Sequence, residues 1–318
     1  MISTKTIRIL AAGALLAGAL GVSPVRAADG EACNTIRFSD VGWTDITATT
    51  AVTTFLLKSL GYSTDIKLLA VPVTYKSMQD KNIDVFLGNW MPTMEADIRP
   101  YLDDKSVDSI GVNLEGAKYT LATNAKGAEL GIKDFADIAK HKDALAGKIY
   151  GIEPGNDGNR LILDMIEADA FGLSGFRVVE SSEQGMLAQV QRSERREQPV
   201  VFLGWAPHPM NANFDLTYLE GGDEWFGPNL GGATVFTNTR AGYAAECPNV
   251  GALLGNLKFS LAMENEIMGA ILDDGADPQD AAKSWMAANA DTVLGWLDGV
   301  TTLGGGDAKE AVSAALHN

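Results

Sequence analysis

The stretch DVFLGNWMPTM at positions 84–94 has a near copy, VVFLGWAPHPM, at positions 200–210. Each copy begins with a short apolar run that has the length and bulk of a buried β-strand. The glycine and the proline that follow predict where the strand ends and the chain turns. Each copy therefore places a tryptophan, Trp90 or Trp205, at the end of a strand. Large aromatic side chains are mostly buried, so two at corresponding strand ends need an explanation.

The segments around the two copies repeat one order of secondary structure. In the first unit we expect strand, helix, strand, helix and strand at residues 35–43, 44–61, 63–71, 74–81 and 83–88. The second unit repeats this order at residues 148–156, 157–169, 176–181, 182–197 and 199–204. Thr44 or Asp45 is expected to cap the first long helix. Alternating strands and helices predict two α/β lobes, each a central sheet flanked by helices.

Two further extended segments, 116–124 and 232–238, are predicted to cross between the lobes. The later part of the chain contains two helical stretches, 253–272 and 277–297, and a Gly-rich break at 303–310 before a last helical turn or two. We therefore expect lobe 1 to comprise residues 28–117 and 237–318, and lobe 2 to comprise residues 118–236.

The first residues resemble a secretory signal peptide. Lys5 and Arg8 precede an apolar run at 9–22, and VRA at 25–27 fits a cleavage site. We expect residues 1–27 to be removed near Ala27 and the mature protein to be periplasmic. No cysteine lies at the expected cut, which argues against a lipid anchor.

The charge of the chain excludes some classes of binding partner, and its cysteines indicate a disulfide. The formal net charge is −16, and residues 1–27 contain bases but no acids, so the mature chain is more negative still. Such a surface repels nucleic acids and anionic lipids, and neither is an expected partner. The two cysteines, Cys33 and Cys247, are expected to form a disulfide in an exported protein. The alternative is two separate buried thiols.

Signals for catalysis are scarce. The sequence contains no G-x-S-x-G, H-E-x-x-H or P-loop motif. The three histidines are too scattered for a metal triad, and only His208 follows a strand near the predicted cleft. We expect no metal, no cofactor and no enzymatic activity. The alternative is an exported hydrolase or lyase that uses Asp45 or Glu153, although no nucleophile and base are paired in the sequence.

Aromatic residues carry the stronger signal. Ligands of open α/β sheets bind beyond the carboxyl ends of the strands. We expect four aromatic side chains to converge there: Trp43, Trp90, Tyr119 and Trp205. Ring faces suit a cation that has no N–H donors, because cation–π attraction holds it without hydrogen bonds. The alternative interpretation is that these residues are part of the hydrophobic core.

Asp45 and Asn156 are candidates for the polar end of the site, and each is also a candidate helix cap. A hydroxyl group of the ligand would donate to Asp45 and accept from Asn156. A carboxylate would meet Asp45 with like charge. The residues therefore favour choline over glycine betaine.

Five motifs carry a resemblance to a known family: GWTD (42–45), FLGNWMP (86–92), KYTL (118–121), PGNDGN (154–159) and FLGWAPHPM (202–210). The chain resembles the periplasmic substrate-binding proteins of quaternary-amine ABC importers, the glycine betaine/choline group, and within it the choline-binding proteins most closely. The resemblance implies a type II periplasmic binding protein fold whose two lobes are joined by two crossing strands and close over the ligand.

The resemblance also implies the ligand contacts and partners. Trp43, Trp90, Tyr119 and Trp205 correspond to an aromatic box, while Asp45 and Asn156 correspond to contacts at the hydroxyl end. The implied partners are choline, with acetylcholine or a betaine bound more weakly, and an ABC permease with its ATPase in the inner membrane. A monomer is expected.

Overall fold

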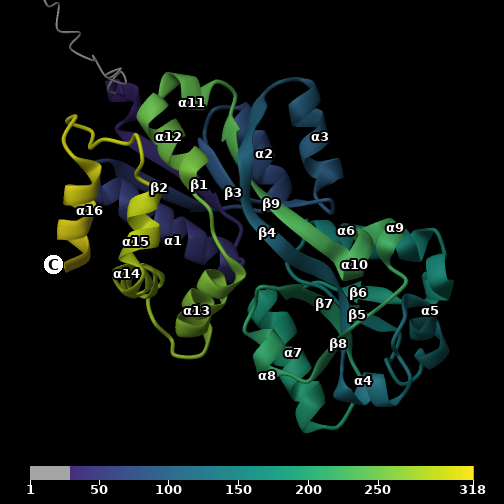
Figure 1. Ribbon diagram of the computed structural model, residues 1–318. Coiled ribbons are helices and arrows are strands. Elements are labelled where there is room, and N and C mark those ends of the chain that lie inside the picture. The colour runs from purple at the N-terminus through teal and green to yellow at the C-terminus, as the bar shows by residue number, and fades with distance from the viewer. Residues whose placement is uncertain (1–28, 318) are drawn as a thin grey trace, which may run out of the picture.

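The computed structural model describes residues 29–317 (Figure 1). The predicted signal peptide at 1–27 lies outside these residues. Across the described range, none of the helices has the length and apolar character needed to cross a membrane.

Nine strands of the described chain form one sheet, in the order β2-β1-β3-β9-β4-β7-β5-β6, with β8 paired beside β4. β1 pairs in parallel with β2 and β3, and β5 pairs in parallel with β6 and β7, as the alternating pattern predicted. The strands are β1 (Thr35–Asp40), β2 (Ser63–Leu68), β3 (Val85–Met91), β4 (Val107–Asn124), β5 (Lys148–Tyr150), β6 (Arg177–Val179), β7 (Val201–Ala206), β8 (Leu216–Tyr218) and β9 (Gly232–Arg240).

The long strands β4 and β9 cross the middle of the sheet. They pair antiparallel from Val107↔Arg240 to Lys118↔Gly232, and β4 continues along β7 from Lys118↔Ala206. Both segments predicted to cross are therefore strands, although β4 begins earlier than expected, at Val107. Figure 1 shows helices gathered on either side of this crossing pair.

The helices form two sets. With β1–β3 they make the first half of the molecule: η1 (Glu31–Cys33), α1 (Thr44–Ser59), α2 (Val71–Gln79), α3 (Glu95–Asp103), α11 (Tyr243–Glu246), α12 (Pro248–Asn256), α13 (Leu261–Leu272), α14 (Pro278–Ala288), α15 (Ala290–Gly295) and α16 (Ala308–His317). With β5–β8 they make the second half: α4 (Ala125–Glu129), α5 (Phe135–Ile138), η2 (Ala139–His141), α6 (Asp157–Glu167), η3 (Ala170–Gly175), α7 (Glu183–Arg195), α8 (Met210–Asn213), α9 (Asp223–Phe226) and α10 (Pro228–Gly231).

The C-terminal helices differ from the sequence prediction. The single helix expected at 253–272 is two helices, because α12 ends at Asn256 and α13 starts after Ser260, whose hydroxyl accepts from the Met263 amide. The stretch expected at 277–297 also divides, at Asn289. The apolar pattern continues through both breaks, so periodicity alone does not reveal them. The last helix, α16, spans 10 residues rather than a turn or two.

Both motif strands continue past the glycine that was expected to end them. β3 includes Trp90, and β7 includes Trp205. The glycines serve close packing instead: a Cβ at Gly88 would lie 2.7 Å from Cδ1 of Ile46 on α1, and Gly204 faces β4 at a comparably short distance. The tryptophans therefore sit in the last residues of their strands, where the pairing fixes their direction.

Cys33 and Cys247 form the predicted disulfide, with their Cα atoms 5.7 Å apart. The bond joins η1 to the start of α12 across 214 residues of sequence. It ties the first described residues and the C-terminal helices to the same half of the molecule.

Replacing both cysteines, as Cys33→Ser with Cys247→Ser, should lower the free energy of unfolding by about 2–5 kcal/mol, because an open chain gains conformational entropy on unfolding. Urea denaturation of the oxidised wild type and the double variant measures the difference. An unchanged midpoint and slope would contradict the prediction.

Candidate functional site

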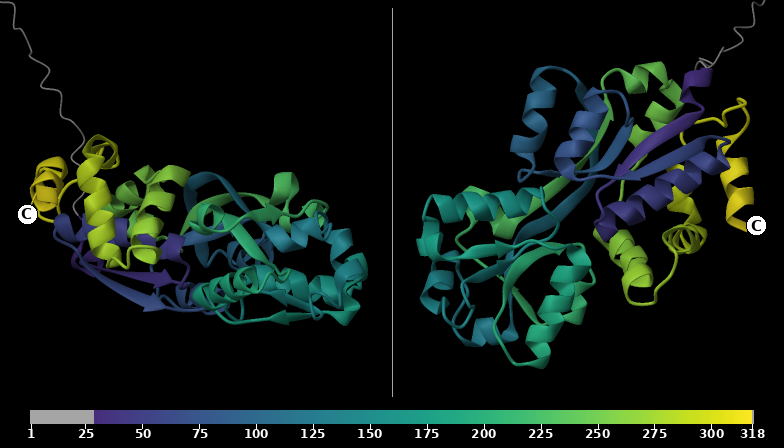
Figure 2. Two further views of the ribbon diagram at one scale, coloured as in Figure 1. Left: turned by 90° about the horizontal axis from the view of Figure 1, so that it is seen from below. Right: turned by 180° about the vertical axis from the view of Figure 1, so that it is seen from behind.

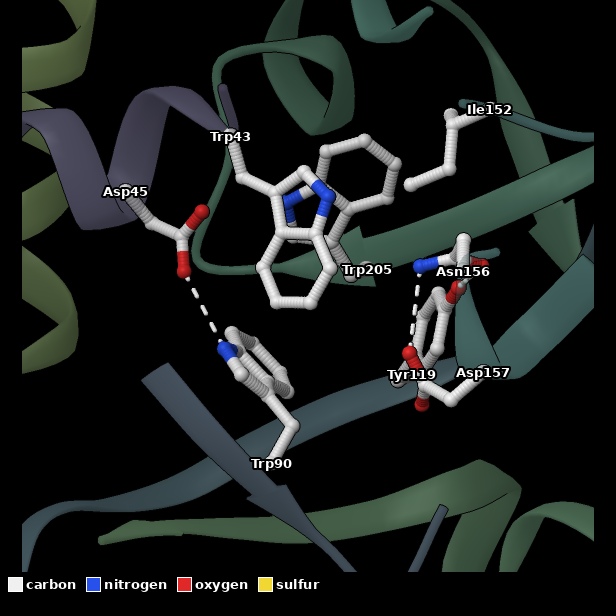
Figure 3. Close-up of a pocket in the computed structure, with 8 residues that line it drawn as sticks. All are labelled: Trp43, Asp45, Trp90, Tyr119, Ile152, Asn156, Asp157 and Trp205. Atoms are coloured by element: carbon white, nitrogen blue, oxygen red, sulfur yellow. Dashed lines mark hydrogen bonds between the residues drawn. The ribbon is translucent and has the colours of Figure 1, made fainter. Parts of the chain in front are cut away.

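A cavity of about 270 Å³ lies between the two halves, and Figure 3 shows the eight residues that line it: Trp43, Asp45, Trp90, Tyr119, Ile152, Asn156, Asp157 and Trp205. All six residues predicted to bind a ligand are among them. Ile152 and Asp157 were not predicted.

Aromatic rings from both halves form most of the cavity wall. The ring centroids of Trp90 and Tyr119 are 6.2 Å apart, and those of Tyr119 and Trp205 are 6.3 Å apart, both in edge-on arrangements. Trp90 comes from β3 and Trp205 from β7, on opposite sides of the crossing pair, while Tyr119 comes from β4 itself. Trp43, just before α1, completes the wall. The arrangement leaves ring faces around one small space.

Asp45 and Asn156 lie on opposite sides of these rings (Figure 3). One carboxylate oxygen of Asp45 accepts from Nε1 of Trp90 at 3.2 Å, and the other is buried without a hydrogen-bond partner among residues 29–317. Asn156 caps α6, as one of its two predicted roles requires, by accepting from the Asn159 amide at 3.0 Å. Its Oδ1 also accepts from the Tyr119 hydroxyl at 2.8 Å.

Asp157 stands beside Asn156 and was missed by the sequence reasoning. The Asn156 amide nitrogen donates to its Oδ1 at 3.1 Å. Its Oδ2 is buried and has no hydrogen-bond partner in the described part of the chain. The signal was present in PGNDGN, where an acid follows the capping asparagine, but helix starts commonly carry acids for electrostatic reasons alone.

The expected capping of α1 by Thr44 or Asp45 is wrong. Trp43 occupies the N-cap position and makes no side-chain cap hydrogen bond, and the helix begins at Thr44. His208 does not line the cavity either. It is buried behind Trp205, with ring centroids 4.8 Å apart.

Several side-chain contacts join the two halves near the cavity. Nε1 of Trp43 donates to Glu153 at 2.8 Å, and Arg160 on α6 donates to Asp97 on α3 at 2.8 Å. A third joins Thr44 to Glu183, whose oxygens accept from the Thr44 amide at 2.8 Å and from its hydroxyl at 2.5 Å. These contacts hold residues of the two halves together beside the cavity residues Trp43 and Asp157.

The cavity is rich in acids and has no base in its wall. None of the eight lining residues, all within the described range, is lysine or arginine. Burial, with the nearby charge of Glu183, raises the pKa of Asp45 to about 8. Burial also raises the pKa of Glu153 to about 7 and that of Asp157 to about 6. A cation in the cavity would offset this unfavourable negative charge.

Two halves built on one sheet, with an enclosed aromatic cavity between them, define the periplasmic binding protein class of fold that the motifs predicted. The chain belongs to the family of substrate-binding domains of ABC-type glycine betaine transport systems, because the model of that family matches residues 34–288. Proteins of this family bind substrates for transport.

Solved structures agree with this assignment. An ABC-transporter choline-binding protein in complex with choline is 70% identical, with a TM-score of 0.90 over 91% of this chain and 100% of that one. An ABC-transporter choline-binding protein in an unliganded semi-closed conformation has the same identity and coverage and a TM-score of 0.84.

A sequence relative is more distant. The chain is 32% identical over 129 residues to the glycine betaine/carnitine transport binding protein GbuC of Listeria monocytogenes. The match covers 41% of this chain and 42% of that protein.

The raised acid pKa values predict that stability without a ligand falls as the pH rises from about 5 to about 8. The folded protein keeps protons on Asp45, Glu153 and Asp157 that the unfolded chain releases above about pH 4, so the folded state binds more protons across this window. Urea unfolding at several pH values measures the slope. The double variant with Asp45→Asn and Asp157→Asn should have a shallower slope, and a wild-type slope that is flat or rises would contradict the assignment.

Proposed function

We propose that this protein captures choline in the periplasm and delivers it to an ABC permease that is driven by an ATPase. The observation that carries the proposal is the combination of four aromatic rings with buried acids in a cavity whose wall has no base. The 70% identity to a choline-binding protein supports the same ligand. Glycine betaine is the alternative, because the family model describes its transport.

The quaternary ammonium group would lie among the rings of Trp43, Trp90, Tyr119 and Trp205. Each ring face contributes about 0.5–2 kcal/mol of cation–π attraction, and several faces together approach the ~8 kcal/mol of a micromolar ligand. The unpaired oxygen of Asp45 lies on one side of the rings, and a bound cation would favour the charged form of this carboxyl group.

The hydroxyl end of choline would face Asn156 and Asp157. The sequence led us to expect Asp45 and Asn156 at this end, and we propose Asp157 as a further candidate beside Asn156 because the two side chains are hydrogen-bonded. Asp157 Oδ2 has no hydrogen-bond partner in the described residues and could accept from the choline hydroxyl. The side-chain amide of Asn156, which donates to Asp157 Oδ1, could also donate to the hydroxyl oxygen of choline. The carboxylate of glycine betaine would meet Asp157 with like charge, which favours choline.

The lobes would move as a trap, with residues 28–117 and 237–318 as lobe 1 and residues 118–236 as lobe 2. The cross-contacts around the cavity and the higher similarity to the choline-bound relative support a closed arrangement here. The proposal includes export by a signal peptide at 1–27, no lipid anchor, and action as a monomer.

The proposal also holds that binding is not followed by a reaction. Asp45 and Glu153, the acids considered for hydrolysis or elimination, are instead hydrogen-bonded to the indoles of Trp90 and Trp43. Choline recovered unchanged after long incubation with the protein is the expected result. Its conversion to another product would establish an enzyme.

Titration calorimetry with choline, glycine betaine and acetylcholine tests the ligand. We expect choline to bind most tightly. Asp157→Asn should narrow the gap between choline and glycine betaine, because it removes the like charge that opposes the betaine carboxylate. Glycine betaine binding more than about tenfold tighter than choline to the wild type would overturn the ligand assignment.

Trp90→Ala and Trp205→Ala should each weaken choline binding by about 1–3 kcal/mol, because each removes a ring face and leaves a gap. Calorimetry measures the affinity and circular dichroism monitors the fold. Trp285→Ala, on α14 and outside the cavity, is the matched control and should bind like the wild type. If Trp90→Ala or Trp205→Ala unfolds the protein, and the fraction that stays folded binds choline with wild-type affinity, the residue belongs to the hydrophobic core.

A further inference from the structure

Helix α1 begins between two cavity residues and lacks a cap from its own sequence. Thr44 is its first residue, with Trp43 before it and Asp45 after it. Trp43 provides no side-chain acceptor, so the first amides of α1 need a partner from elsewhere. Any group that holds Thr44 also fixes the directions of its two neighbours in the cavity wall.

Glu183 is that partner, and it comes from the other half of the molecule. It is the first residue of α7, between β6 and β7, whereas α1 lies between β1 and β2. Oε2 accepts from the Thr44 amide at 2.8 Å, and Oε1 accepts from the Thr44 hydroxyl at 2.5 Å. The Glu183 side chain is fully buried. A carboxylate at a helix N-terminus is stabilised by the amides and by the helix dipole.

His208 holds Glu183 in place. Nδ1 of His208 accepts from the Met210 amide at 2.8 Å, so the ring proton lies on Nε2. Nε2 then donates to Oε1 of Glu183 at 3.1 Å. The same ring packs edge-on against Trp205 of the cavity wall. A continuous buried chain of contacts therefore runs from Trp205 in one half to Thr44 in the other.

We infer that Glu183 is a positioning residue that caps α1 across the cavity and thereby locks Trp43 and Asp45 against the bound ligand. Glu183 does not line the cavity, so it acts on the ligand through Thr44. The inference rests on the proposed function, since it assigns Glu183 and His208 a part in retaining choline. It gives His208 a role that does not involve ligand contact.

The lock should act on ligand release more than on ligand entry. The hydrogen bonds between Glu183 and Thr44 join two halves that must separate before the ligand leaves. A ligand that enters meets the open cleft before these hydrogen bonds form. Most affinity differences within one binding site likewise arise in the dissociation rate.

Stopped-flow tryptophan fluorescence with choline tests this. Hydrogen bonds to a charged group are strong enough that Glu183→Ala should accelerate dissociation about ten- to a hundred-fold, and Glu183→Gln by less, with association changed little. Glu167→Gln, an exposed charge change on α6, is the matched control and should release choline like the wild type. Dissociation of Glu183→Ala at the wild-type rate would overturn the inference.

A double-mutant cycle separates a lock from a merely structural residue. Thr44→Val removes the hydroxyl that bonds to Glu183 and retains the shape of the side chain. If the two residues act together, the effects of Thr44→Val and Glu183→Ala on dissociation are not additive. Additive effects would show that Glu183 does not act through Thr44 and would overturn the inference.

Hydrogen exchange distinguishes failure of this inference from failure of the ligand assignment. The amides at the start of α1, residues 44–47, should exchange faster in Glu183→Ala than in wild type when both proteins are saturated with a ligand that closes the two halves, because their cap is lost. A wild type that does not bind choline would refute the proposed ligand, and the same exchange comparison with glycine betaine bound would still decide the lock. Equal exchange in both proteins would overturn the lock.

Discussion

The antiparallel pairing of β4 with β9 is the constraint on which the rest of the structure depends. These strands run through the middle of the sheet and fix the two parallel groups on either side at a set register. Tyr119 lies on β4 directly opposite Trp205 of β7, and Trp90 lies on β3 opposite Val235 of β9. Three of the four rings therefore lie on paired strands of the sheet. Figure 2 shows the crossing strands joining both halves from two further directions.

This frame places several acids around the cavity, where burial disfavours their charged form when no cation is present. Asp45 and Asp157 are buried and Glu153 is half-buried, and burial is the largest cause of the raised pKa of each. A quaternary ammonium ion cannot donate hydrogen bonds, so it offsets these charges without competing for the partners that hold Asp45 and Asn156 in place. The buried acids thus destabilise the closed state when the cavity is empty, and a bound cation removes this destabilisation. Binding of the ligand therefore favours closure.

Local patterns predicted the order of elements, the crossing segments, the disulfide and six residues that now line one cavity. The elements and the site residues depend on short-range periodicity, on turn residues or on motifs, and the disulfide depends on the presence of two cysteines in an exported chain. The errors share a different cause. Gly88 is explained by Ile46 on a neighbouring helix, and the start of α1 is explained by Glu183, 139 residues away. Asp157 was hidden because its charge suits a helix start as well as a binding site. Long-range packing decides the role of Gly88 and the start of α1, and a single sequence does not display such packing.

The second half of the molecule leaves and returns to the first at neighbouring points. The chain departs along β4 and comes back along β9, while the disulfide keeps both ends of the described chain in the first half. The whole intervening stretch is thus one uninterrupted module with two adjacent joints. Replacing this second half with that of a relative would leave the first half and its disulfide unchanged. The residues that the second half contributes to the cavity can therefore vary together in evolution, while those of the first half stay constant.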